Sequence, residues 1–119
     1  MLFRSLLVNL DKLAEQLHET ALEKGFWAPL DRMEPEDDFI FYCKQLAMIH
    51  SEATEVLEAL RKEKGPDVVL EELADIIIRV LDLYAGLYDS GEVTDSLNDV
   101  VKRKAEINKG RARLHGVRG

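Results

Sequence analysis

The chain has 119 residues, the length of one compact domain, and 46% hydrophobic with 33% charged residues is the composition of a soluble globular protein. Its 23 acidic residues outnumber the 16 basic ones, which gives a net charge of −7. This excess of negative charge disfavours binding to nucleic acid, because the phosphate backbone attracts Lys and Arg. We therefore expect no nucleic-acid partner.

Cysteine usage and the N-terminal sequence indicate the compartment. Cys43 is the only cysteine, which excludes an internal disulfide and suits a reducing environment. Polar and charged residues interrupt the apolar ones near the N-terminus, so the sequence contains no secretory core. It also lacks a stretch of about 20 apolar residues that would span a membrane. We expect a cytoplasmic protein without a membrane partner.

The first predicted element is an amphipathic helix, in which apolar residues recur with a helical period from Phe3 to Ala21. Gly25 in "EKGFW" suits the C-terminal cap of this helix. The next segment, "APLDRMEPEDD", contains Pro29 and Pro35 and predicts a polar loop.

A second helix is predicted from about Asp37 to Lys64. "KGPD" ends it, because Gly65 can cap a helix and Pro66 cannot continue a helix interior. The apolar spacing predicts a core stripe made of Phe39, Cys43, Leu46, Ala47, Ala53, Leu57 and Leu60. Cys43 is interpreted as a small apolar filler of this stripe.

The third predicted helix begins with Asp67 as its N-cap and reaches about Tyr88. Its centre, "ELADIIIRVLDLY", is apolar on more than one face. A helix that is apolar nearly all round must be surrounded by other elements, and a chain of this length offers few. We therefore infer a homodimer or homotetramer whose interface covers this helix.

A fourth helix is predicted from Val93 to Asn108, with Leu97, Val100, Val101 and Ala105 facing inward. Residues 109–119 form a basic, glycine-containing tail. Four helices without a strand pattern predict a single all-α domain over residues 1–119. We expect a four-helix, up-and-down bundle-like protomer whose core is completed by homo-oligomerisation.

One line of charge runs along the otherwise apolar third helix. Glu72, Asp75, Arg79 and Asp82 follow one another at spacings of three, four and three, which places them on one face. Structural roles are expected for Arg79 and Asp82, either as a buried pair that orients other side chains or as an inter-subunit salt bridge.

The second helix carries a matching pair of acids, Glu52 and Glu55, one turn apart. At about 1.5 Å per residue, Glu55 and Asp75 both lie roughly 14–15 Å from the turn between the helices, and so at the same level. If these faces meet, four carboxylates converge: Glu52, Glu55, Glu72 and Asp75.

Four converging carboxylates repel one another unless they take up protons or a cation. One Glu-x-x-Glu pair usually lies on a solvent-exposed face of a helix. A second acidic pair on an apolar helix favours metal binding, because burying charge on such a helix costs free energy. Oxygen ligands favour Mg²⁺, with Mn²⁺ as a substitute, and Mg²⁺ commonly shares its shell with phosphate oxygens. A di-iron site is disfavoured because it requires Glu-x-x-His on two helices.

Four segments in order resemble the MazG-like all-α nucleoside triphosphate pyrophosphohydrolases. They are "EKGFW", "IHSEATEVLEALR", "ELADIIIRVLDL" and "KAEINKGRARLHG". The hallmark of this family is Glu-x-x-Glu followed by Glu-x-x-Asp, which here are "EATE" and "ELAD" with sixteen residues between them. The similarity spans nearly the whole chain.

The resemblance implies that Glu52, Glu55, Glu72 and Asp75 bind Mg²⁺. It implies cleavage of a nucleoside triphosphate between the α and β phosphates to a monophosphate and pyrophosphate. Glu55 is our first choice for the general base, with Glu52 as the other catalytic carboxylate. Removal of modified or surplus nucleotides is the role that the resemblance suggests.

The substrate-binding residues that the resemblance implies are Lys104, Asn108 and Arg111 near phosphate or sugar, and Trp27 near the base. The residues themselves leave simpler roles open, since basic residues suit a helix C-terminus and a lone Trp often packs a helix end. Two other functions remain: a phosphoribosyl-ATP pyrophosphatase, and a non-catalytic helical assembly module. An enzyme should gain thermal stability with Mg²⁺, and an assembly surface should not.

Overall fold

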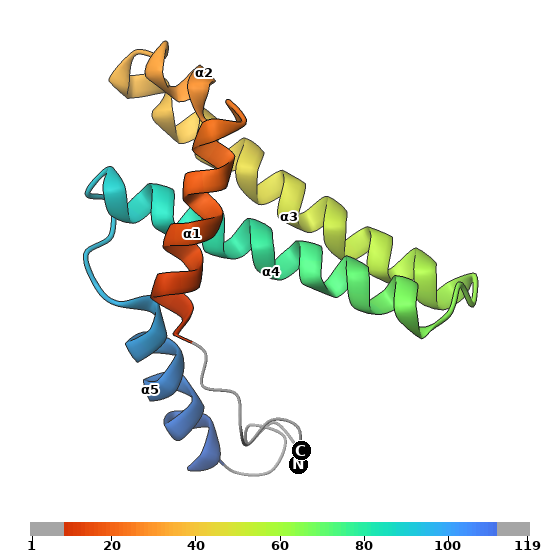
Figure 1. The fold of residues 1–119 in the computed structure, drawn as a ribbon. Helices are drawn as coiled ribbons and strands as arrows, with labels where there is room; N and C mark the ends of the chain where they lie inside the picture. Colours follow the sequence, from red (N-terminus) through yellow and green to blue (C-terminus); the bar gives the residue numbers. More distant parts are fainter. Residues whose placement is uncertain (1–8, 112–119) are drawn as a thin grey trace.

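The computed structural model describes residues 9–111, and the only regular secondary structure over that range is helical, so the all-α prediction is confirmed. The elements are α1 (Leu10–Glu23), α2 (Ala28–Asp31), the 3₁₀ turn η2 (Pro35–Asp37), α3 (Asp38–Arg61), α4 (Pro66–Asp89) and α5 (Leu97–Lys109) (Figure 1). No helix in the described part of the chain has both the length and the apolar character needed to cross a membrane.

The two longest helices, α3 and α4, form an antiparallel hairpin (Figure 1). Gly65 enters α4 with a φ of +104°, a conformation that glycine adopts without strain. Pro66 then occupies the first position of the helix, where a missing N–H costs nothing. Asp67 was predicted as the N-cap and lies instead in the first turn, because the Gly-Pro pair begins the helix earlier.

Helix α1 crosses the hairpin and packs on α4, and α5 packs against α1 (Figure 1). The fourth predicted helix begins at Leu97 and not at Val93, because Ser96 is its N-cap. Asp11 of α1 accepts hydrogen bonds from the Ser96 hydroxyl and from Asn98 N, the latter at 2.9 Å. These bonds hold the start of α5 beside the start of α1.

The segment predicted as a polar loop contains two short helical turns, α2 and η2, so that prediction was wrong in part. Each turn begins with a proline, Pro29 or Pro35, in its first positions. Proline suits the first turn of a helix because its fixed φ is already helical. Gly25 does have a positive φ after α1, as expected of a residue that follows the C-cap.

The core of one chain is small. One buried cluster consists of Ala21, Trp27, Phe41 and Leu83, and the other of Ala14, Leu81 and Ala85. The radius of gyration is 17.0 Å, whereas a compact domain of about this length has a value of roughly 13 Å. A single chain is therefore an open arrangement of helices.

The core stripe predicted for α3 was wrong. Phe39 and Leu57 are 73% and 53% exposed, and Cys43 is exposed as well. Leu46, Leu60, Ala47 and Ala53 are likewise exposed. The face that meets the other helices carries Phe41 and Ala59. Helix α3 has two apolar faces, and periodicity alone did not indicate which one the same chain covers.

Apolar side chains also remain exposed on α4 and α5. Those of α4 include Leu70, Leu73, Ile77, Ile78 and Val80. On α5, Leu97 and Val100 are half-buried as predicted, but Val101 and Ala105 are exposed. The excess of apolar surface that the sequence indicated on the third helix is therefore present in the single chain.

Candidate functional site

Three carboxylates meet in the middle of the α3–α4 hairpin. Glu52 comes from α3, and Glu72 and Asp75 come from one face of α4. Each offers one oxygen, and these oxygens all lie within 4.8 Å of one another, close enough for a single metal ion to contact them together. The structure therefore brings together three of the four predicted ligands, at the level along the hairpin that helix rise predicted.

Glu55, the fourth predicted ligand, lies outside this group of oxygens and is exposed one turn along α3. It still acts on the group electrostatically. Partial burial raises the pKa of Glu72, and the negative charges of Asp75, Glu52 and Glu55 raise it further. The carboxylates therefore repel one another, and a cation among them relieves this repulsion.

A cation of the protein itself already contacts the cluster. Arg79 follows Asp75 by one turn on α4, and its Nε donates a hydrogen bond of 3.0 Å to Glu52 Oε1. The Glu52 side chain is only 17% exposed, so this ion pair is less screened by water than a surface pair. Arg79 was expected to pair with Asp82 or to form an inter-subunit salt bridge, whereas within one chain it pairs with Glu52 and joins α4 to α3.

Asp82, the last charge in the line on α4, holds two side chains of other elements. Trp27 Nε1 donates to Asp82 Oδ1 and Oδ2 at 3.0 and 3.1 Å. His18 Nδ1 of α1 lies 2.8 Å from Asp82 Oδ1. Sequence reasoning missed His18, although its spacing of four from Ala14 and three from Ala21 places it on the buried face of α1.

Trp27, predicted to lie near a base, is 4% exposed. Its ring packs on Phe41, with ring centroids 5.1 Å apart, and against Gly86 of α4. A Cβ at Gly86 would lie 2.1 Å from the ring, so only glycine fits there. In one chain, Trp27 therefore has the position of a packing residue.

A cavity of about 300 Å³ adjoins the carboxylates. Its charged lining residues are Glu52, Asp75, Arg79 and Asp82, and the rest of the lining consists of Leu17, Thr20, Ala21, Phe26 and Ile78. Among the residues that line it, Arg79 is the only basic one. A site that joins a carboxylate cluster, one guanidinium and an apolar wall can accept a ligand with both an anionic and an apolar part.

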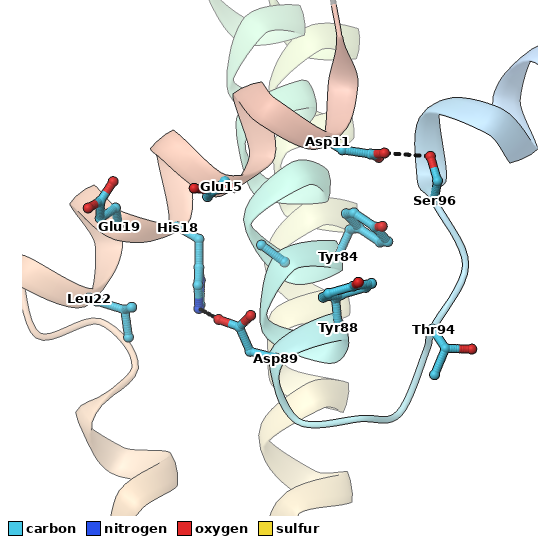
Figure 2. Close-up of a pocket in the computed structure, with 11 residues that line it drawn as sticks. Asp11, Glu15, His18, Glu19, Leu22, Tyr84, Tyr88, Asp89, Thr94 and Ser96 are labelled. Atoms are coloured by element: carbon cyan, nitrogen blue, oxygen red, sulfur yellow. Dashed lines mark hydrogen bonds and ion pairs between the residues drawn. The ribbon is translucent and has the colours of Figure 1, made fainter.

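A larger cavity of about 540 Å³ lies between α1 and the end of α4 (Figure 2). Its acids are partly engaged in holding the fold: Asp11 binds Ser96, and Asp89 Oδ2 lies 3.4 Å from His18 Nε2. None of the three clustered carboxylates lines it. We therefore place the candidate site at the smaller cavity.

The predicted phosphate contacts lie elsewhere in the single chain. Lys104 and Asn108 are exposed on α5, and Arg111 is exposed just after it. Helix α5 starts beside Tyr84 of α4, whose hydroxyl accepts from Leu97 N at 3.2 Å, and runs away from the hairpin (Figure 1). One chain therefore does not bring these residues together with the carboxylates.

No protein-family model, curated protein or solved structure matches the chain significantly. The functional assignment therefore depends on the site itself. Its distinguishing features are the three clustered oxygens, the Arg79–Glu52 pair and the cavity that Glu52, Asp75 and Arg79 line.

Proposed function

We propose that the protein is a Mg²⁺-dependent nucleoside triphosphate pyrophosphohydrolase that releases a nucleoside monophosphate and pyrophosphate. The observation that carries this proposal is the group formed by Glu52, Glu72 and Asp75, whose oxygens lie within 4.8 Å of one another. The resemblance of "EATE", "ELAD" and the C-terminal segment to MazG-like enzymes supports the same activity.

The donor set fits a hard divalent ion, because all three ligands are carboxylate oxygens. Such an ion, Mg²⁺ or Mn²⁺, supplies neutralisation of phosphate charge and activation of water. Glu55 completes the set of acids and, in our proposal, accepts the proton of the attacking water, with Glu52 beside it. Its exposure leaves it accessible to substrate and solvent.

We also propose that the protein is a homodimer or homotetramer. The exposed apolar side chains of α3 and α4 support this, since an isolated soluble chain rarely leaves so many uncovered. The assembly closes the bundle and brings α5 of a neighbouring copy to the carboxylates. Lys104, Asn108 and Arg111 of that copy then contact the polyphosphate or sugar.

A non-catalytic helical assembly module is the second candidate, favoured by the same exposed apolar faces. The two functions differ in their response to Mg²⁺. In the enzyme, metal bound to the native state raises the melting temperature by mass action. In an assembly module, the carboxylates form a solvated rim and the melting temperature does not change.

The deciding experiment is a screen of nucleoside triphosphates, including modified bases and phosphoribosyl-ATP, with Mg²⁺. Pyrophosphate and orthophosphate are measured separately. We expect pyrophosphate from the wild type and a loss of at least about 100-fold in Glu55→Gln and Asp75→Asn. Glu58→Gln is the matched control, because Glu58 pairs with Arg61 at 3.3 Å outside the cluster. Orthophosphate as the only product, or full activity in both variants, contradicts the proposal.

A further inference from the structure

The ion pair between Arg79 and Glu52 joins two helices and also involves the candidate metal site. Among the described residues, Arg79 forms the only Arg or Lys ion pair that joins two helices. Its partner, Glu52, is also one of the three acids that can hold a metal ion. The same carboxylate therefore serves both the guanidinium and the candidate metal site.

The charges around Arg79 explain why it pairs with Glu52. Asp82 lies one turn further along α4, but Trp27 and His18 already bind its oxygens. Glu72 and Asp75 share α4 with Arg79, whereas Glu52 is the member of the acidic group that faces Arg79 from α3. The guanidinium supplies one positive charge to a group of three acids and leaves the group with excess negative charge.

We propose that Arg79 is the counter-cation of the metal-free site and a phosphate-binding residue of the loaded one. This inference rests on the proposed function. A divalent cation bound by Glu52, Glu72 and Asp75 lies close to the guanidinium, and the two cations repel each other. Arg79 then leaves Glu52 and turns within the cavity towards the phosphate oxygens of the substrate.

The lining of the cavity supports this second role. Arg79 is the only basic residue on the wall, and the acids around it repel a polyphosphate that lacks a cation. A guanidinium presents a planar fork of donors that matches two phosphate oxygens at once. Because Arg79 is half-exposed at the cavity, it can exchange Glu52 for such a ligand without unfolding α4.

Two binding measurements on the intact protein test this inference. In the first, electron paramagnetic resonance measures the binding of Mn²⁺ alone. In the second, the binding of pyrophosphate is measured in the presence of saturating Mn²⁺. Arg79→Met removes the competing charge, so Mn²⁺ alone should bind more tightly, by on the order of tenfold. Pyrophosphate should bind more weakly by on the order of tenfold, because a charge-assisted contact is lost. A residue that only supports the fold would weaken both.

Arg79→Lys is the second variant and keeps the charge without the planar fork. It should bind Mn²⁺ as the wild type does and pyrophosphate more weakly. Arg61→Met is the matched control and should change neither value, because Arg61 pairs with Glu58 on α3 alone. Circular dichroism checks that each variant is folded.

The outcomes separate the two proposals. If the wild type binds no Mn²⁺, both fail. If Glu72→Gln abolishes Mn²⁺ binding but Arg79→Met leaves it unchanged or weakens it, the metal site stands and the role of Arg79 is refuted. Unchanged pyrophosphate binding in Arg79→Met refutes its role as a phosphate ligand.

Discussion

Replacing Gly86 by alanine gives the sharpest test of how Trp27 is held. An alanine inside a helix normally stabilises it by about 1 kcal/mol relative to glycine. Here the new Cβ would lie 2.1 Å from the Trp27 ring, which is far inside van der Waals contact. The indole ring is rigid and packed on Phe41, so it must shift as a body.

The shift has two costs. Overpacking a close contact destabilises a fold by about 1–3 kcal/mol. Moving the ring also breaks the hydrogen bonds of 3.0 and 3.1 Å from Trp27 to Asp82, and a hydrogen bond to a charged group contributes about 1.5–3 kcal/mol. After the gain in helix propensity is subtracted, we expect Gly86→Ala to lower the free energy of unfolding by about 2–5 kcal/mol and the melting temperature by roughly 10–20 °C.

Thermal and denaturant unfolding at one fixed protein concentration measure this loss. Trp27 is the only tryptophan, so a red shift of its emission reports exposure of the ring. Gly110→Ala is the control, because its Cβ meets only Ile107 O at 3.6 Å, and we expect a change within about 0.5 kcal/mol. A stable Gly86→Ala protein with unshifted emission would refute the described packing of Trp27.

Two further predictions concern charge and assembly. The pKa of Glu72 is raised above its ordinary value of 4.5, so the metal-free protein should lose stability as the pH rises from that value through the raised pKa. Glu72→Gln should remove this loss, and equal pH profiles of the two proteins in melting experiments would contradict the described repulsion. Ile77, 54% exposed in the single chain, should lie in the proposed interface. Ile77→Arg should therefore reduce the mass measured by sedimentation, whereas a wild type that sediments as a monomer would contradict the assembly.

The carboxylate cluster could be predicted from the sequence because it depends on two regular quantities. The rise per residue determines how far a residue lies from the turn between the helices, and a spacing of three places two residues on the same face of a helix. Glu52, Glu72 and Asp75 therefore meet as expected. The partner of Arg79 could not be predicted in this way, because a long side chain reaches either its own helix or the next, and only packing decides between them.

The buried face of α3 could not be predicted from the sequence, for a different reason. The residues from Phe39 to Leu60 repeat at helical spacing, but so do Phe41 and Ala59 on the other side of α3. Both patterns have the right period, and the position of α4 selects the second. Trp27 is similar, since an aromatic residue after a helix end suits either stacking or packing until Gly86, distant in sequence, is placed beside it.

The bonds between Asp11 and the start of α5 have a consequence for the order in which the chain folds. Helices α3 and α4 are neighbours in sequence and can pair as soon as both have left the ribosome. Helix α1 emerges first, yet Ala14 packs with Leu81 and Ala85, and Asp11 meets Ser96 and Asn98. Contacts so distant in sequence form slowly, and α1 packs mainly on α4, so α1 should remain undocked until α4 has been synthesised.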